Sequence, residues 1–178
     1  MNRPKSLFKA VFIIAVFFGF VGSTKAQQQG DPPTVRELVV GAFQITRTNL
    51  ISLIISSDSL MVFKTEKKVN GLDNYIGVDN YKSTVQLIGD DKDLQSARFT
   101  FAFTTEHDVN KLQYMRMSYF VVSIAGKSGL DWFYGPSGKF SKNPTEAINE
   151  HQQLDYLNAD FKYDPKDKAI SIIFTKFK

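Results

Sequence analysis

Two histidines are the side chains of this sequence best suited to acid–base or metal chemistry. His107 lies between two acidic residues, and His151 has Asp155 four residues further along the chain. Residues four apart share one face of a helix, so His151 and Asp155 would be neighbours if this segment were helical. The two histidines lack the spacing of a zinc motif such as His-Glu-x-x-His, and we interpret both as solvated side chains. We therefore predict no metal site and no catalytic residue.

The segment 135–139 (GPSGK) combines glycines with a lysine, as a phosphate-binding loop does. The Walker pattern also needs a glycine where Phe133 stands and a serine or threonine where Phe140 stands. Without that hydroxyl the loop has no magnesium ligand, and we predict no nucleotide or other cofactor. The sequence also has no Gly-x-Ser-x-Gly elbow. A Ser–His–Asp arrangement stays open, because its members are distant in sequence.

The segment 130–136 (LDWFYGP) places the only tryptophan beside a phenylalanine and a tyrosine. Three consecutive aromatic side chains cannot all point into one face of a core, so at least one should be exposed or lie at a pocket rim. Exposed aromatic rings are common contacts for sugars, peptides and proteins. We therefore predict a binding surface formed by Asp131, Trp132, Phe133 and Tyr134. The alternative is that Trp132 fills the core and that the segment is a buried strand or loop anchor.

The formal net charge of +4 suggests at first an anionic partner. The first 26 residues, however, hold four of the 22 basic residues and none of the 18 acidic ones. Residues 27–178 therefore contain equal numbers of both and have no net charge. Because a nucleic-acid-binding face must neutralise phosphates, we predict that nucleic acid is not a partner.

Residues 1–26 have the three parts of a secretory signal peptide. Basic residues precede an apolar run of 13 residues at 10–22, and Thr24 and Ala26 are small residues before a cleavage point. This run is shorter than the roughly 20 residues of a membrane-spanning helix, which is the alternative, so we expect no stable membrane insertion after cleavage. The cleavage region resembles the leaders of Gram-negative secreted proteins, which implies export to the periplasm or the exterior.

The rest of the chain is predicted to be one domain behind a short tether. Residues 27–33 (QQQGDPP) are polar and are interrupted by glycine and proline, which is typical of a flexible segment. Residues 34–178 are enough for a single hydrophobic core. The chain contains no cysteine, so this core must stabilise the domain without disulfides.

Helical patterns occur in two parts of the domain. A capping box at Thr34 and Glu37 with apolar residues three and four apart predicts a helix over residues 34–48. Residues 50–55 (LISLII) fit either its continuation or a buried strand. Residues 105–125 are predicted to be helical, with a strand as the alternative for the second half. Their apolar stripe has 3-4-3 spacing and is predicted to face the core: Leu112, Met115, Tyr119 and Val122.

Two further segments complete the second half of the domain. Residues 126–143 are rich in glycine and are predicted to be a long irregular segment, and residues 145–155 a short helix. A turn at Asp164 and Pro165 between two β-rich runs predicts a C-terminal hairpin over residues 160–177.

Strand patterns begin at residue 59. Asn70 and Gly71 predict a hairpin turn, because both central positions of a type I′ turn need positive φ. Residues 81–88 alternate and would place on one face Tyr81, Ser83, Val85 and Leu87. Residues 97–104 give the clearest strand, with one face formed by Ala97, Phe99, Phe101 and Phe103. Together the elements predict an α+β fold, an antiparallel sheet of about five or six strands with one or two helices packed on one face.

These observations favour a small exported, non-catalytic binding or interaction protein with an unknown protein or small-molecule partner. The alternatives are a small envelope-directed hydrolase-like enzyme, in which His151 and nearby acids would do the chemistry, and a structural or assembly accessory of the cell envelope.

Overall fold

The computed structural model describes residues 43–177 and confirms the α+β class. The predicted signal peptide, the tether and residues 34–42 of the predicted N-terminal helix lie outside these described residues. Within the described range, neither helix combines the length and the apolar character that crossing a lipid bilayer requires.

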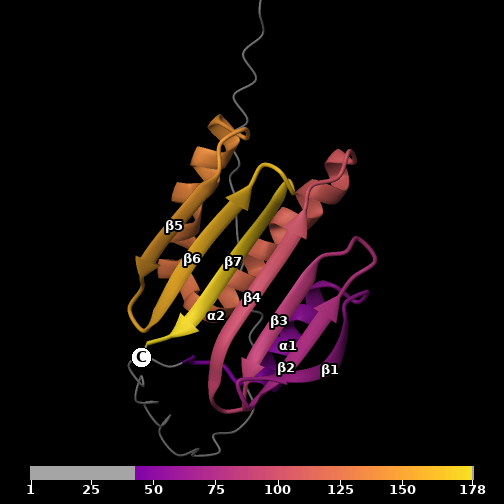
Figure 1. Cartoon of the computed structure of the whole chain (residues 1–178), viewed down its shortest axis with the longest axis vertical. Helices are drawn as coiled ribbons and strands as arrows, with labels where there is room; N and C mark the ends of the chain where they lie inside the picture. Colours follow the sequence, from indigo (N-terminus) through magenta and orange to yellow (C-terminus); the bar gives the residue numbers. More distant parts are fainter. Residues whose placement is uncertain (1–42, 178) are drawn as a thin grey trace, which may run out of the picture. The chain divides into compact units, whose positions relative to one another are not determined.

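One seven-stranded antiparallel sheet forms the framework of the described chain. The strands are β1 (Val62–Val69), β2 (Leu72–Val78), β3 (Thr84–Gly89), β4 (Leu94–Ala102), β5 (Ile148–Gln153), β6 (Leu157–Asp164) and β7 (Ala169–Lys176). Their order is β1-β2-β3-β4-β7-β6-β5, so two meanders meet where β4 pairs with β7 at the centre (Figure 1). The sheet therefore has more strands than the five or six that the sequence predicts.

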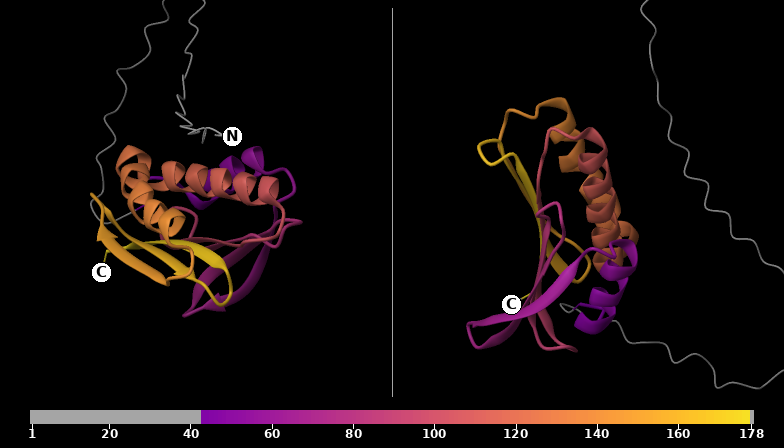
Figure 2. Two further views of the ribbon diagram at one scale, coloured as in Figure 1. Left: turned by 90° about the horizontal axis from the view of Figure 1, so that it is seen from above. Right: turned by 90° about the vertical axis from the view of Figure 1, so that its right-hand side faces the viewer.

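Two helices cover one face of this sheet and leave the other face open (Figure 2). They are α1 (Arg47–Ser57) and α2 (His107–Lys142). In Figure 1, α1 lies behind β2 and β3, and α2 crosses behind the other half of the sheet. The helix α2 connects the central strand β4 to the edge strand β5. It contacts both of these strands, the two strands between them and α1.

The strand of clearest alternation lies at the centre of the sheet. Ala97, Phe99 and Phe101 of β4 are buried toward the helices, as predicted. The Phe99 ring packs against Phe120 of α2, with ring centroids 5.7 Å apart. Phe103 lies just beyond the strand end and is partly buried against this core.

Turn chemistry sets where the strands begin. Asn70 and Gly71 have φ values of 51° and 81°, which confirms the predicted hairpin between β1 and β2. The predicted strand over residues 81–88 begins later, at Thr84, because Lys82 has a φ of 63° and interrupts the extended backbone. Tyr81 consequently lies in the turn before the strand and is exposed, whereas Val85 and Leu87, with which it was predicted to share a strand face, are buried.

The predicted helix over 34–48 is wrong for residues 43–46 and right for residues 47–48, since α1 begins at Arg47. Thr46 has extended backbone dihedrals, and its side chain accepts a hydrogen bond from the backbone N–H of Asn49, which makes it the N-cap. The ambiguous run 50–55 is therefore the centre of α1, and it buries Leu50 and Ile54.

The predicted irregular segment 126–143 is wrong, because α2 continues through it to Lys142. Its glycines and Pro136 are poor helix formers, but the segment also supplies side chains that the core needs. Phe133 is fully buried, and its ring packs against that of Phe161. Only Gly126 departs from helical geometry, with φ 56° and ψ −146°, and it divides α2 into two straight parts.

The predicted short helix over 145–155 is also wrong, because residues 148–153 form strand β5. This segment follows Pro144, whose carbonyl oxygen accepts a hydrogen bond from the hydroxyl of Tyr163 at 2.8 Å. It then pairs along its whole length with β6. Such pairing depends on a partner strand later in the chain, which local helical spacing does not reveal.

We expect Gly126→Ala to lower the free energy of unfolding by about 1–3 kcal/mol, because its φ and ψ lie in a region that is almost exclusive to glycine. Gly138→Ala in the same helix is the matched control. No atom lies within 4 Å of the Cβ that it would add, so it should stabilise the helix by about 0.5–1 kcal/mol. Urea unfolding of both variants checks this, and equal effects of the two would contradict it.

Candidate functional site

The outer surface of α2 carries the most unusual feature of the described chain, an exposed apolar stripe. This outer stripe consists of Leu112, Met115, Tyr119 and Val122, the same residues that the sequence predicts to be core. Met115, Tyr119 and Val122 are 50%, 64% and 43% exposed, so that prediction is wrong. The helical period is the predicted one, but the stripe points away from the sheet.

A second apolar stripe on α2 faces the sheet instead. Met117, Phe120, Val121 and Ile124 are all buried in the core. The helix is therefore apolar on two opposite sides between residues 112 and 124. A surface helix of a globular protein normally has one apolar side and one polar side, and a helix that is apolar all round is normally buried. The outer stripe thus has the composition of an interface.

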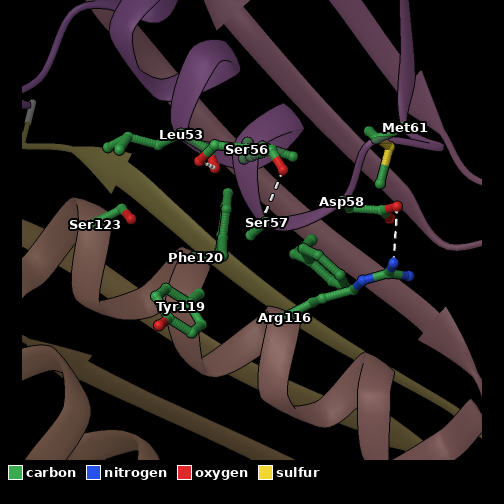
Figure 3. A pocket seen from close by; sticks show the side chains of 11 residues that line it. Leu53, Ser56, Ser57, Asp58, Met61, Arg116, Tyr119, Phe120 and Ser123 are labelled. Atoms are coloured by element: carbon green, nitrogen blue, oxygen red, sulfur yellow. Dashed lines mark hydrogen bonds and ion pairs between the residues drawn. The ribbon is translucent and has the colours of Figure 1, made fainter.

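A groove between α1 and α2 extends the outer stripe (Figure 3). Leu53 of α1, which is 47% exposed, and Tyr119 of α2 both line it. Its deepest part is a cavity of about 80 Å³ that reaches Phe99 of the sheet. Pockets for drug-sized ligands have volumes of about 300–1,000 Å³, so this cavity has room for no more than one small side chain.

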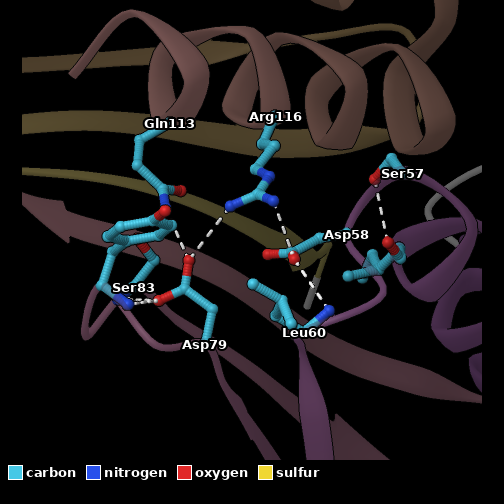
Figure 4. Close-up of polar contacts among 9 residues, drawn as sticks. Ser57, Asp58, Leu60, Asp79, Ser83, Gln113 and Arg116 are labelled. Atoms are coloured by element: carbon cyan, nitrogen blue, oxygen red, sulfur yellow. Dashed lines mark hydrogen bonds and ion pairs between the residues drawn. The ribbon is translucent and has the colours of Figure 1, made fainter. Parts of the chain in front are cut away.

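A buried guanidinium group fixes the two helices beneath this groove (Figure 4). Arg116 of α2 bonds to Asp58, just after α1, at 2.8 Å and to Asp79, just after β2, at 3.2 Å. Gln113 of α2 donates a second hydrogen bond to Asp79. All four side chains are buried or nearly so. We call Asp58, Asp79, Gln113 and Arg116 the Arg116 network.

The two carboxylates also order the backbone around them. Asp79 accepts hydrogen bonds from the backbone N–H groups of Tyr81 and Ser83, which closes the turn before β3. Asp58 accepts one from the backbone N–H of Leu60, where the chain leaves α1. The remaining oxygen of Asp58 and Nε of Arg116 are closed off from solvent and have no hydrogen-bond partner. Other atoms of the same two side chains line the cavity, so the network holds the helices and forms part of the groove wall.

The other end of α1 is held by the turn between β3 and β4. The side chain of Asp91 accepts hydrogen bonds from the hydroxyl and the backbone N–H of Thr48, at 2.6 and 2.8 Å. These bonds hold the pKa of the Asp91 carboxyl below its usual value. Arg47 donates to the carbonyl of Gly89 and lies over the ring of Tyr75. With both ends attached, α1 presents Leu53 beside the outer stripe.

The binding surface predicted from the sequence lies on the second half of α2, not in a loop. Phe133 is fully buried, and Trp132 is partly buried with its ring edge-on to Phe174. Tyr134 is 54% exposed, which agrees with the expectation that one of the three rings is accessible. Asp131 is exposed and bonds to Lys127 at 2.5 Å. The structure thus separates these four residues between core and surface.

The two histidines lie on different elements. His107 is the first residue of α2, whereas His151 is on β5 and pairs with Asp160 of β6 at 3.0 Å rather than with Asp155. The helical neighbourhood predicted for His151 is wrong because the segment is a strand. Among residues 43–177, no three side chains of the metal-ligating types come together.

Sequence reasoning missed the Arg116 network. Its only local signal is that Gln113 and Arg116 stand three residues apart beside the buried apolar residues Met117 and Phe120. Polar residues at core spacing need buried partners, but the sequence does not show that these partners are Asp58 and Asp79.

Comparison with known proteins does not assign the chain to a family. No family profile, curated protein sequence or solved structure matches it.

We expect Arg116→Met to lower the free energy of unfolding by about 3–5 kcal/mol, because it leaves two buried carboxylates without their counter-ion. Lys127→Met removes an ion pair from the same helix whose two side chains are exposed, so it should cost about 0.5 kcal/mol or less. Denaturant unfolding distinguishes them. If the loss for Arg116→Met is as small as for the control, the network does not hold the helices together.

Proposed function

We propose that this protein is an exported, non-catalytic interaction module that binds an apolar partner with the outer face of α1 and α2. The single observation that supports this most strongly is the outer stripe of α2, which exposes Met115, Tyr119 and Val122 on a helix whose opposite side is already buried. Covering such a surface is favourable by about 25 cal/mol for each Å² of apolar area removed from water. A partner that contacts α2 and Leu53 of α1 together would gain this free energy.

The rigidity of the groove also supports a binding role. The Arg116 network and the bonds of Asp91 to Thr48 fix α1 at both ends. The binding surface therefore exists before the partner arrives, and association does not have to pay the entropy of ordering it. Sites on fixed helices are also more precise than sites on loops.

The hydrolase-like alternative would rely on His151. Its imidazole bonds to Asp160, but its side chain is 61% exposed on an edge strand and lines none of the cavities described above. Catalytic groups usually lie in a concave, water-excluding site. The interaction role through the outer face of α1 and α2 is therefore the better supported proposal.

Export remains part of this proposal, and it rests on the sequence of residues 1–26. We expect mass spectrometry of the protein secreted by its natural source to find Gln27 at the N-terminus. Recovery of the chain from membranes with Met1 still in place would contradict the cleavage.

An apolar dye tests the binding surface. At protein concentrations at which the chain sediments as a monomer, we expect Nile red to fluoresce strongly with the native protein. Tyr119→Ser combined with Met115→Ser should reduce this fluorescence several-fold, because the two side chains form the exposed centre of the outer stripe. Tyr134→Ser and His151→Ala are matched controls at exposed positions and should leave it unchanged.

Two outcomes would argue against the proposed surface. If Tyr134→Ser removes the fluorescence and the pair on the outer stripe does not, the surface over residues 131–134 is the binding site instead. If the native protein does not bind the dye at concentrations at which it sediments as a monomer, the outer face lacks the apolar character that the proposal requires. Thermal unfolding of each variant shows that the fold is retained.

A further inference from the structure

The outer stripe is symmetric along its helix, and this symmetry indicates what covers it. Met115 and Tyr119 lie at equal distances along the sequence before and after Met117. Leu112 and Val122 also lie at equal distances from Met117, further along in each direction. The part of α2 that carries them is straight from His107 to the kink at Gly126. It is roughly 28 Å long at 1.5 Å per residue. A second copy of this helix that runs in the opposite direction about the level of Met117 would therefore place each apolar position opposite another apolar position.

We propose that the outer stripe packs against the outer stripe of a second copy of this chain, with the two α2 helices antiparallel about a two-fold axis at the level of Met117. This rests on the proposed function and names its partner. In such an isologous contact Met115 of one copy faces Tyr119 of the other, and Leu112 faces Val122. Each of these apolar pairs thus occurs twice in the interface.

The charges at the two ends of the stripe favour this direction. The N-terminal end carries Glu106, the exposed Asp108 and the exposed Lys111. Just after the kink at Gly126 stands Lys127, whose side chain is 87% exposed, with its ion-pair partner Asp131. An antiparallel pair places Asp108 of each copy near Lys127 of the other. A parallel pair would place like charges together, which is unfavourable. Lys127 already bonds Asp131 and has further donors for a second carboxylate.

The neighbouring helix does not break this arrangement. Leu53 of α1 lies beside Tyr119 across the groove and is itself exposed, so it extends the apolar contact on one flank. The charged Arg116 points inward to the Arg116 network and does not interrupt the stripe. The surface offered to a second copy is therefore apolar in its centre and charged only at its ends, as protein interfaces commonly are.

Sedimentation of the purified chain over a range of concentrations tests the association. We expect a reversible dimer, and we expect Tyr119→Lys to raise its dissociation constant about tenfold or more. Tyr134→Lys, at a similarly exposed position on the same helix, should leave it unchanged. The N-terminal residues are the same in every variant. A dimer that formed through those residues would therefore have the same dissociation constant in all of them.

Charge reversal tests the direction of the two helices. Asp108→Lys and Lys127→Glu should each weaken the dimer by about threefold. Combining them in one chain restores opposite charges across the axis and should recover most of the affinity. If the combined variant is weaker than either single one, the antiparallel arrangement is wrong.

Cross-linking gives a geometric check, because the natural chain has no cysteine. A mixture of Met115→Cys and Tyr119→Cys chains should form a disulfide-linked heterodimer under mild oxidation. Asp108→Cys alone should not form one, since the two copies of residue 108 would lie at opposite ends of the interface. Efficient linkage through residue 108 would overturn the arrangement.

The results separate this inference from the proposed function. A chain that sediments as a monomer at all concentrations but still binds Nile red through the outer stripe refutes the second copy and leaves a different apolar partner. A dimer that Tyr119→Lys does not affect refutes the inference, because it forms through another surface. A monomer whose outer stripe does not bind the dye contradicts both proposals.

Discussion

The contact between Arg116 and two buried carboxylates determines how the helices lie on this sheet. Asp58 comes from the end of α1 and Asp79 from the turn before β3, so one guanidinium joins three parts of the chain. Removing charges from water costs several kcal/mol for each ion, and the contacts of Arg116 with both carboxylates compensate for part of this cost. One oxygen of Asp58, Oε1 of Gln113 and Nε of Arg116 are buried without a hydrogen-bond partner. The main effect of the network is therefore to disfavour other positions of α1, and its net contribution to the free energy of unfolding is smaller. As a result, the groove beside it has one defined shape.

The outer stripe follows from how the sheet is covered. A single layer of two helices protects one face of the sheet, and α2 must bury Met117, Phe120 and Val121 to do so. Nothing in that packing requires apolar residues on its outer side. Met115 and Tyr119 are there nonetheless, beside Leu53 of α1. Packing within residues 43–177 does not account for these exposed residues, and the proposed contact with another molecule would.

Patterns that depend on neighbours in sequence were predicted well. The hairpin at Asn70 and Gly71, the buried face of β4 and the C-terminal hairpin all have the expected form, because turn dihedrals and side-chain alternation are local properties. Residues 126–143 and 145–155 were predicted wrongly. The first is held helical by the burial of Phe133, and the second becomes a strand because β6 offers it a partner. Both causes lie far away in the chain.

The sequence by itself determined the α+β class, the period of α2, the absence of disulfides and the neutral charge of residues 27–178. Only the tertiary structure decided which of the two apolar stripes of α2 faces the sheet. Helical spacing shows that residues share a side, but both sides of α2 are apolar and period alone cannot choose between them. Arg116 contributes to that choice, because its partners Asp58 at the end of α1 and Asp79 after β2 fix this side of α2 against the neighbouring helix and the sheet.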